Sequence, residues 1–390
     1  MQKVISSEKL PIKMWLDEPD EGTLRQVRNL ANLPFLFKHV ALMPDAHSGY
    51  GMPIGGVIAT DGAIIPNAVG VDIGCGMCAV KTNLRSDEIL TTTLKDVLSS
   101  IRQRVPLGFE HHAERQSESL MPEGHDIDKL YVVRSNYAGA LKQLGTLGGG
   151  NHFIEIQKDE AGFVWVMLHS GSRNIGLKVA EFYNNKAKKL NTLWLSSVDT
   201  KADLAFMPFD VAEAHNYYLE MRYCVDFAFA NRRLMMTHIQ EAFATHINNV
   251  IFDPIINIAH NYAAWEKHFD KKVLVHRKGA TSAKEGETGI IPGSQGTKSY
   301  IVEGLGNPES FMSCSHGAGR MMSRTQAIKT LNLEDEISKL DALGVIHGIR
   351  HKKDLDEAAS AYKNIDEVMN FQKDLVHIKH TLKPLAVIKG

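Results

Sequence analysis

Side chains suited to metal binding or catalysis are spread over nearly the whole chain, and this spread is the strongest constraint on its fold. They stand in glycine-rich segments from Asp45 to Lys389. Because Gly and Pro mark turns, such segments are expected in loops between regular elements. No internal repeat, low-complexity tract or linker divides the 390 residues. We therefore expect the motifs to converge in a single domain covering residues 1–390, with α/β (α+β) architecture.

The pattern of apolar residues predicts mixed strands and helices. Short β-prone stretches alternate with turns between residues 36 and 82, and the chain closes with a predicted strand over 385–388. Helices are predicted over 212–248, where apolar residues recur at helical spacing without Pro or Gly, and at four other places. The other predicted helices are 86–104, 126–144, 319–329 and 365–375, and the other strands are 153–156, 163–168, 272–276 and 299–302.

Charge and composition exclude several classes of protein. The 44 Lys and Arg residues are balanced by 45 Asp and Glu residues, so the chain has no general basic excess of the kind that coats nucleic acid. An enzyme that grips only the ends of a strand would need no more than a local basic patch. The first residues lack the apolar core of a signal peptide, no apolar run could cross a bilayer, and four cysteines are too few for a disulfide framework. We expect a cytoplasmic protein without membrane attachment.

The densest chemical motif is the glycine-rich stretch 70–76, which contains Asp72 and Cys75. Their i, i+3 spacing, with glycines between and after them, lets a carboxylate and a thiolate turn toward one point, as metal ligands do. A buried cysteine in a tight turn is the simpler alternative. Cys75 and Cys78 also form a C-x-x-C, which could be a redox pair or half of a zinc knuckle, but the chain has no second C-x-x-C.

Three histidines in distinctive settings extend this motif. His152 lies in Gly-Gly-Gly-Asn-His-Phe, His169 in His-Ser-Gly-Ser-Arg, and His260 in Asn-Ile-Ala-His-Asn. Each alone is more often a hydrogen-bonded structural histidine. With Asp72 and Cys75 they offer more donors than a closed tetrahedral zinc site needs, which favours a two-metal centre or one open site. The donor types leave Mn, Zn, Fe and Co open.

Four further loops offer backbone N–H groups beside Lys or Arg, as anion-binding sites do. Taken singly, each could be an ordinary turn. The run from Gly293 to Ser299 resembles a P-loop, but only two residues separate its glycines and the Lys is displaced, so we exclude a P-loop NTPase. The four loops are 145–150, 278–281, 292–298 and 316–320.

Taken in order, these motifs resemble the RtcB family of RNA ligases. The resemblance spans nearly the whole chain and implies the family's α/β body with a deep central metal cleft. The matching segments are Asp45-Ala-His-Ser-Gly-Tyr-Gly, Gly70-Val-Asp-Ile-Gly-Cys-Gly, Leu147-Gly-Gly-Gly-Asn-His-Phe-Ile-Glu155, His169-Ser-Gly-Ser-Arg173, Arg277-Lys-Gly-Ala-Thr, Ile291-Pro-Gly-Ser, Ser315-His-Gly-Ala-Gly-Arg320, Ala361-Tyr-Lys and Val387-Ile-Lys-Gly.

The resemblance assigns roles to individual residues. It implies that His316 is the nucleophile that becomes guanylylated, that Asp45 supports the site, and that Arg173 and Arg320 lie near phosphate. It places the family's Mn(II) ligands, expected to hold two ions bridged by the cysteine, at Asp72, Cys75, His152, His169 and His260. Nucleotide contacts are expected from Asn151, Glu155, Ser294, Gly317, Ala318, Gly319, Tyr362 and Lys389.

The implied activity joins RNA 3′-phosphate or 2′,3′-cyclic phosphate ends to 5′-hydroxyl ends. GTP would be the cosubstrate, His316-GMP and an RNA(3′)pp(5′)G end the intermediates, and tRNA splicing or RNA repair the setting. We expect a monomer, and the sequence identifies no helper protein. One alternative is a binuclear metal-dependent phosphoesterase acting on RNA phosphates, and another is a non-catalytic RNA-binding or metal-storage protein.

The chain departs from the family pattern in three places. The segment from Asp356 to Tyr362 lacks the proline that often precedes the tyrosine, which predicts a looser guanine-contacting loop. Gln295 stands where Met is frequent. Cys78 is an additional thiol that we do not count as a ligand.

Overall fold

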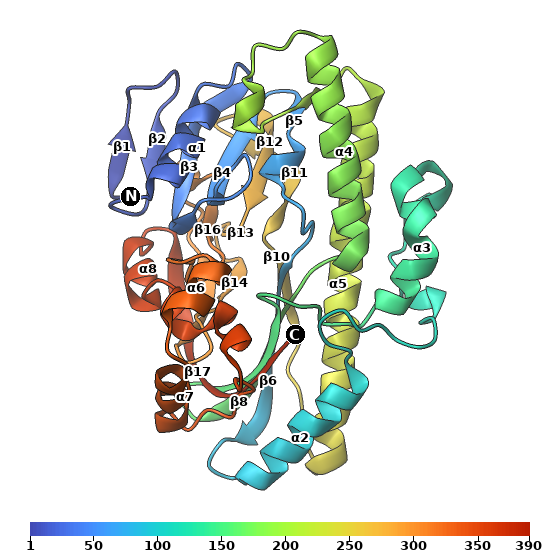
Figure 1. Cartoon of the computed structure of the whole chain (residues 1–390), viewed down its shortest axis with the longest axis vertical. Coiled ribbons are helices and arrows are strands. Elements are labelled where there is room, and N and C mark those ends of the chain that lie inside the picture. The colour runs from blue at the N-terminus through green and yellow to red at the C-terminus, as the bar shows by residue number, and fades with distance from the viewer.

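Two large sheets form the framework of the protein, one in the upper half and one in the lower half of Figure 1. The computed structural model describes residues 1–390. The upper sheet has the order β1 (Lys3–Ile5), β2 (Ile12–Met14), β3 (Leu36–His47), β4 (Ile54–Thr60), β12 (Lys271–Lys278) and β11 (Asn261–His268). All its neighbouring strands are antiparallel except β2 and β3.

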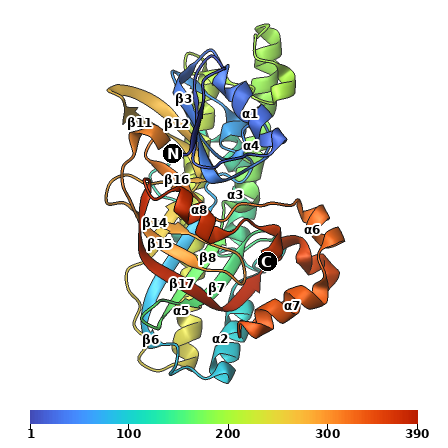
Figure 2. The ribbon, with the colours of Figure 1, turned by 90° about the vertical axis from the view of Figure 1, so that its left-hand side faces the viewer.

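The lower sheet is antiparallel throughout and faces the viewer in Figure 2. Its order is β10 (Ile256–Ala259), β6 (Gly76–Arg85), β8 (Phe163–Ser170), β7 (Phe153–Lys158), β17 (Val376–Lys389), β15 (Ser299–Gly304) and β14 (Thr288–Ile291). Two small ribbons complete the strands: β13 (Ala280–Ser282) with β16 (Ser313–Ser315), and β5 (Ala63–Ile64) with β9 (Met207–Pro208). Mixed helices and sheets in one body agree with the predicted fold class.

One long helix, α5 (Ala212–His246), runs along the molecule on the right-hand side of Figure 1, beside both sheets. No helix combines the length and the apolar composition that a membrane crossing requires. The other helices are α1 (Glu21–Ala31), α2 (Thr91–Arg104), α3 (Tyr131–Gln143), α4 (Arg173–Leu193), α6 (Arg324–Thr330), α7 (Leu333–Ala342) and α8 (Ile365–Phe371).

The middle of α5 carries two buried polar residues whose side chains form hydrogen bonds with the backbone of several loops. The Asn231 amide oxygen accepts from the backbone N–H groups of Gly145 (2.7 Å) and Thr146 (3.2 Å), and its amide nitrogen donates to the Gly171 carbonyl (3.1 Å). Arg232 donates from Nη1 to the Gly74 carbonyl (2.8 Å), and its Nε donates to an asparagine side chain of β10. Buried loop backbone therefore obtains its hydrogen-bond partners from α5.

The structure confirms most of the predicted elements and corrects several of their ends. The strand predicted at the end of the chain is much longer, because β17 begins at Val376. The prediction of a helix over 319–329 is wrong at its start, since Gly319 has a φ of +75° and Arg320 forms a β-bridge with Tyr362, so α6 begins only at Arg324. α4 was not predicted, because a polar run rich in Lys and Asn conceals its buried face.

We predict that Asn231→Leu destabilises the protein by about 2–4 kcal/mol, because it leaves buried backbone N–H groups without partners. Urea denaturation followed by circular dichroism measures the change. Asn216→Leu is the matched control, since Asn216 lies exposed on the same helix. The control should change stability by no more than about 0.5 kcal/mol. Equal stabilities of the two variants would show that the hydrogen bonds of Asn231 do not stabilise the protein.

Candidate metal centre and adjoining cavity

The pairing of four strands brings predicted metal ligands to one end of the lower sheet. The first residue of β6, Gly76, pairs with β8 on one side and with β10 on the other. Cys75 immediately precedes β6, His169 is the next-to-last residue of β8, and His260 immediately follows β10. His152 immediately precedes β7, whose first residue pairs with His169. Residues far apart in the chain thus become neighbours through strand register.

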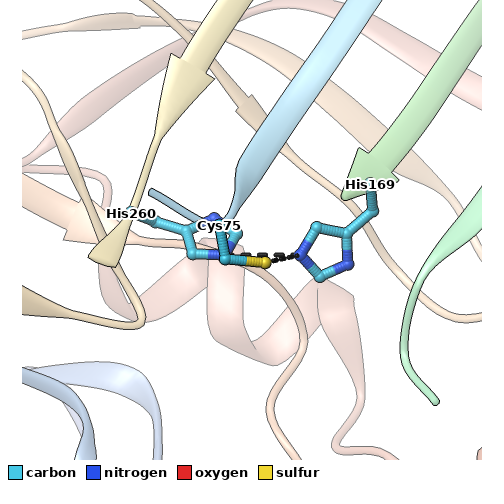
Figure 3. A group of neighbouring side chains, drawn as sticks. All are labelled: Cys75, His169 and His260. Carbon is cyan, nitrogen blue, oxygen red and sulfur yellow. Dashed lines mark hydrogen bonds between the residues drawn. The ribbon is translucent and has the colours of Figure 1, made fainter. Parts of the chain in front are cut away.

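The five predicted ligands form two overlapping groups that share Cys75. In the first group, Cys75 Sγ lies 3.2 Å from His169 Nε2, and that nitrogen lies 3.3 Å from His260 Nε2 (Figure 3). In the second group, His152 Nε2 lies 3.5 Å from Cys75 Sγ and 3.1 Å from Asp72 Oδ2. The ligand atoms within each group lie within 4.8 Å of one another. A thiolate common to both groups suits a bridging position between two ions.

Hydrogen bonds on the far side of two imidazole rings fix which nitrogen faces the cluster. Nδ1 of His152 lies 2.9 Å from the Leu147 carbonyl oxygen, and Nδ1 of His169 lies 3.1 Å from that of Asn151. A carbonyl only accepts, so each Nδ1 carries a hydrogen, and in a neutral ring Nε2 is then the atom with a lone pair toward the cluster. Burial lowers the pKa of both His169 and His260 well below the ordinary value, which keeps these rings neutral, as metal ligands must be.

Cys75, unlike the histidines, must lose a proton before it can bind a metal as a thiolate. Burial and the neighbouring Asp72 carboxylate raise its pKa well above the ordinary value, so without a cation the thiol keeps its proton. A metal ion would have to displace that proton to gain a thiolate ligand. Lone pairs of oxygen, nitrogen and sulfur converging on one buried point fit a transition-metal ion, and they do not choose among such ions.

Asp45 and His316 form a second chemical unit beside the cluster. Asp45, fully buried at the end of β3, accepts through Oδ2 from His316 Nδ1 (2.6 Å) and from the backbone N–H groups of His316 (3.1 Å) and Gly317 (3.2 Å). The His316 ring centroid lies 4.7 Å from that of His260. Gly319 has a φ of +75°, and a Cβ there would collide with the Asp45 carbonyl oxygen, so glycine is required for this close approach.

The Asp45 contact leaves one ring nitrogen of His316 available for chemistry. When Nδ1–H donates to the carboxylate, Nε2 carries the free lone pair. The side chain is 16% exposed and lines a cavity of about 950 Å³. The cavity lining also includes His169 and these residues predicted to contact nucleotide or phosphate: Asn151, Glu155, Ser294, Gly317, Ala318, Gly319, Arg320, Tyr362 and Lys389.

Glu155 and Lys389 lie at one side of this cavity because β7 and β17 are neighbours in the sheet. Lys389 pairs with Phe153, and its Nζ lies 5.7 Å from the ring centroid of Phe153. Burial raises the pKa of Glu155 to about 8. Burial also lowers the pKa of Lys389, although Glu357 and other carboxylates oppose that shift. The ammonium makes no hydrogen bond within the protein, so it is free to meet a ligand in the cavity.

No role was predicted for Glu357 and Arg324, yet both line the cavity. Glu357 is buried and pairs through Oε1 with Arg324 Nε (2.7 Å) and Arg320 Nη1 (3.1 Å), while its Oε2 accepts from the Tyr362 hydroxyl. Arg320 also donates to the Asp356 carbonyl (2.6 Å), so much of its hydrogen-bonding capacity is used within the protein. The one signal available in the sequence was that Glu357 lies in the segment without the family's proline.

Arg173 lies beside the metal cluster and does not line the cavity. It begins α4 with a φ of +60°, and its Nε donates to Thr146 Oγ1 (3.2 Å). Burial lowers its pKa, while the nearby Asp72 and Cys75 raise it. The guanidinium packs over Gly148, where any Cβ would collide with it. The glycine-rich loop before His152 thus makes room for a cation beside the cluster.

In the loop 278–281, which was predicted to bind an anion, the lysine binds backbone carbonyls. The buried Lys278 ammonium donates to the backbone carbonyls of Tyr50 (2.5 Å), Met52 (2.9 Å) and Asn67 (2.9 Å). Burial lowers its pKa to about 7. The prediction that this lysine faces an anion is therefore wrong, because its three donors hold the loop after β3 against the loop after β5.

Comparison with known proteins identifies relatives over the full length. The family model described as "tRNA-splicing ligase RtcB" matches residues 26–138 and 123–390. The chain is 40% identical to the "RNA-splicing ligase RtcB" of Escherichia coli K12, with 100% of this chain and 99% of that protein covered. It is 33% identical to the "tRNA-splicing ligase RtcB" of Nanoarchaeum equitans and 32% identical to that of Thermococcus kodakarensis. These two matches cover all of this chain and 95% and 94% of the relatives.

We predict that Cys75→Ala strongly reduces Mn(II) binding, and that wild-type protein binds about two ions. Affinity should rise with pH, because the Cys75 proton, held by a raised pKa, must leave when metal binds. Titration calorimetry in buffers of different ionisation enthalpy measures the stoichiometry and the released proton. Cys78→Ala is the control, since this buried thiol is not in either ligand group. Loss of metal in Cys78→Ala but not in Cys75→Ala would refute the assignment.

Proposed function

The chain belongs to the RtcB family, and we propose that it is an RNA ligase that joins 3′-phosphate or 2′,3′-cyclic phosphate ends to 5′-hydroxyl ends. GTP is the proposed cosubstrate and Mn(II) the proposed metal. The observation that carries this proposal is the 2.6 Å contact between Asp45 and His316 Nδ1, next to a thiolate and imidazole cluster. With Nδ1–H held by the carboxylate, His316 Nε2 is the ring nitrogen left to act as nucleophile toward a cavity large enough for a nucleotide.

The proposed reaction has three steps, each a nucleophilic displacement at a phosphorus atom. His316 Nε2 attacks the α-phosphorus of GTP, a P–O bond breaks, and pyrophosphate leaves. An oxygen of the RNA 3′-phosphate then attacks the phosphorus of His316-GMP, which frees the imidazole and gives an RNA(3′)pp(5′)G end. Finally the 5′-hydroxyl of the second strand attacks the 3′-phosphorus, loses its proton, and displaces GMP. A 2′,3′-cyclic phosphate is first opened by water to the 3′-phosphate.

The side chains of the cavity supply binding and orientation for these steps. Asp45 stabilises the positive charge that develops on the His316 ring during attack, because it lies against Nδ1. Glu155, whose pKa of about 8 keeps it largely protonated at neutral pH, can donate as well as accept on a nucleobase edge. Lys389 adds a point charge near it. Asn151, Ser294 and Tyr362 complete the proposed nucleotide contacts.

The two overlapping ligand groups are the proposed metal site. Bound Mn(II) would neutralise charge on the leaving pyrophosphate and on the RNA phosphate. Arg173, which lies beside the cluster, would add positive charge there. Hydrolysis alone would need only the metal cluster, so the paired His316 favours the ligase over a binuclear phosphoesterase. We further propose that residues 1–390 act as one catalytic domain and as a monomer, in tRNA splicing or RNA repair.

We predict that His316→Ala abolishes both the covalent GMP adduct and the ligation of 3′-phosphate RNA. It should still seal RNA that already carries a 3′-ppG end, because that substrate has passed the step that needs the nucleophile. Radiolabelled GTP measures the adduct, and gel electrophoresis of labelled RNA measures ligation. Sealing of the preactivated end separates a lost nucleophile from a misfolded protein. An adduct that persists in the variant would place the nucleophile elsewhere.

We predict that Lys389→Met raises the GTP concentration needed for half-maximal adduct formation by about 10–100-fold. The basis is the loss of one charged hydrogen bond of about 1.5–3 kcal/mol. Gly390 is kept, because it packs against the Gly148 carbonyl. Lys379→Met, on the same strand and exposed, is the control. Metal content should be unchanged in both variants, and adduct formation in Lys389→Met that matches the control would remove Lys389 from the nucleotide site.

A further inference from the structure

Four exposed cations, three of them between residues 350 and 353, form no salt bridge with an acidic side chain. Arg102 lies in the last turn of α2, and Arg350, Lys352 and Lys353 follow α7. None of them forms an ion pair, and the one hydrogen bond among their side chains runs from Arg350 Nη1 to the neighbouring Ile349 carbonyl (2.6 Å). In a protein of net charge −1, such a group is a local excess of positive charge. Unpaired cations held close together favour an anionic ligand.

The two segments that carry these cations pack on the same strand. Ile101 of α2 shares a hydrophobic cluster with Ile388 of β17, and Ile346 packs against that cluster. Ile346 also forms a parallel β-bridge with Ala386 of β17. Figures 1 and 2 both place the C-terminus next to α2 and the segment that carries α6 and α7. The positive charge of Arg350 contributes, after burial, to lowering the pKa of Arg102, as expected for facing like charges.

A fully exposed aromatic ring stands on the segment that follows α2, where Gly108 approaches Gly390 at the end of the same strand, β17. Phe109 is 99% exposed, and the backbone N–H of Gly108 donates to the Gly148 carbonyl (3.1 Å). The same loop continues to Asn151, which lines the cavity, and to His152 of the metal cluster. Phe109 therefore stands, exposed, on a segment that is hydrogen-bonded to the loop carrying Asn151 and His152.

An exposed aromatic ring beside unpaired cations is the arrangement that binds single-stranded nucleic acid. Bases stack on the ring and cations track the phosphates, whereas a paired duplex offers no free base face. Glu110 follows Phe109, and Asp354 follows Lys353 and accepts from the backbone N–H of Arg350 (2.9 Å), so two carboxylates stand against four cations and leave a positive excess. We infer that Phe109, Arg102, Arg350, Lys352 and Lys353, the outer strand site, hold the unpaired RNA that leads to the end being joined.

This inference rests on the proposed ligase function, because RNA must extend outward from the cavity. The first test is fluorescence anisotropy with a labelled, unstructured RNA of roughly a dozen nucleotides ending in a 3′-phosphate. The triple variant Arg350→Glu, Lys352→Glu, Lys353→Glu should bind at least about tenfold more weakly, with a shallower dependence on salt. Lys3→Glu, Lys9→Glu, Lys189→Glu is the matched control, because these exposed lysines also lack ion pairs and lie in the upper part of the molecule.

The ring is tested separately from the charges. Phe109→Ala should weaken binding of the single strand by about fivefold or more without changing the salt dependence, and Phe109→Trp should restore binding. A fully paired RNA of the same sequence should bind equally to wild type and to Phe109→Ala. Wild-type affinity in both the triple variant and Phe109→Ala would overturn the inference.

Adduct formation separates this inference from the proposed function. The triple variant and Phe109→Ala should form the His316 adduct with GTP and Mn(II) at the wild-type rate, because no RNA takes part in that step. Ligation of dilute RNA ends should fall with RNA binding. If wild-type protein forms no adduct and joins no ends, the ligase proposal fails, while the anisotropy comparison still decides whether the outer strand site binds RNA.

Discussion

The reaction site depends on the hydrogen bonds that the middle of α5 makes to loops from different strands. Asn231 and Arg232 satisfy backbone groups at Gly74, Gly145 and Gly171, and these loops lead to the metal-ligand positions. Glycine-rich backbone has many alternative conformations, so its folded geometry must be imposed by partners outside the loop. A rigid helix supplies those partners at fixed spacing.

The histidines of the site differ in the hydrogen-bond partner of Nδ1. His152 and His169 turn Nδ1 toward backbone carbonyls, which directs Nε2 toward the cluster as the atom that could bind a metal. His316 turns Nδ1 toward the buried carboxylate of Asp45, which stabilises a positive charge on the ring. The same side chain is thus suited to metal binding in one case and to nucleophilic attack in the other.

The segment without the family's proline is more tightly connected than the sequence suggested. A looser loop before Tyr362 was predicted, yet Glu357 ties Tyr362, Arg320 and Arg324 into one buried group. Three hydrogen-bonded partners restrict this loop as a proline would, by a different means. The prediction of a loose guanine-contacting loop is therefore not supported by these contacts.

The sequence by itself determined the donor types and the fold class, because motifs such as Asp72 with Cys75 and the helical spacing of 212–248 are local patterns. The family resemblance named the histidines that meet, but local patterns could not have done so, since their meeting follows from the register among β6, β7, β8 and β10. Nor could the sequence reveal that Lys278 serves backbone carbonyls or that Glu357 pairs with two arginines, because both depend on partners distant in sequence. Tertiary structure decided these roles, since a side chain's chemistry is set by what surrounds it after folding.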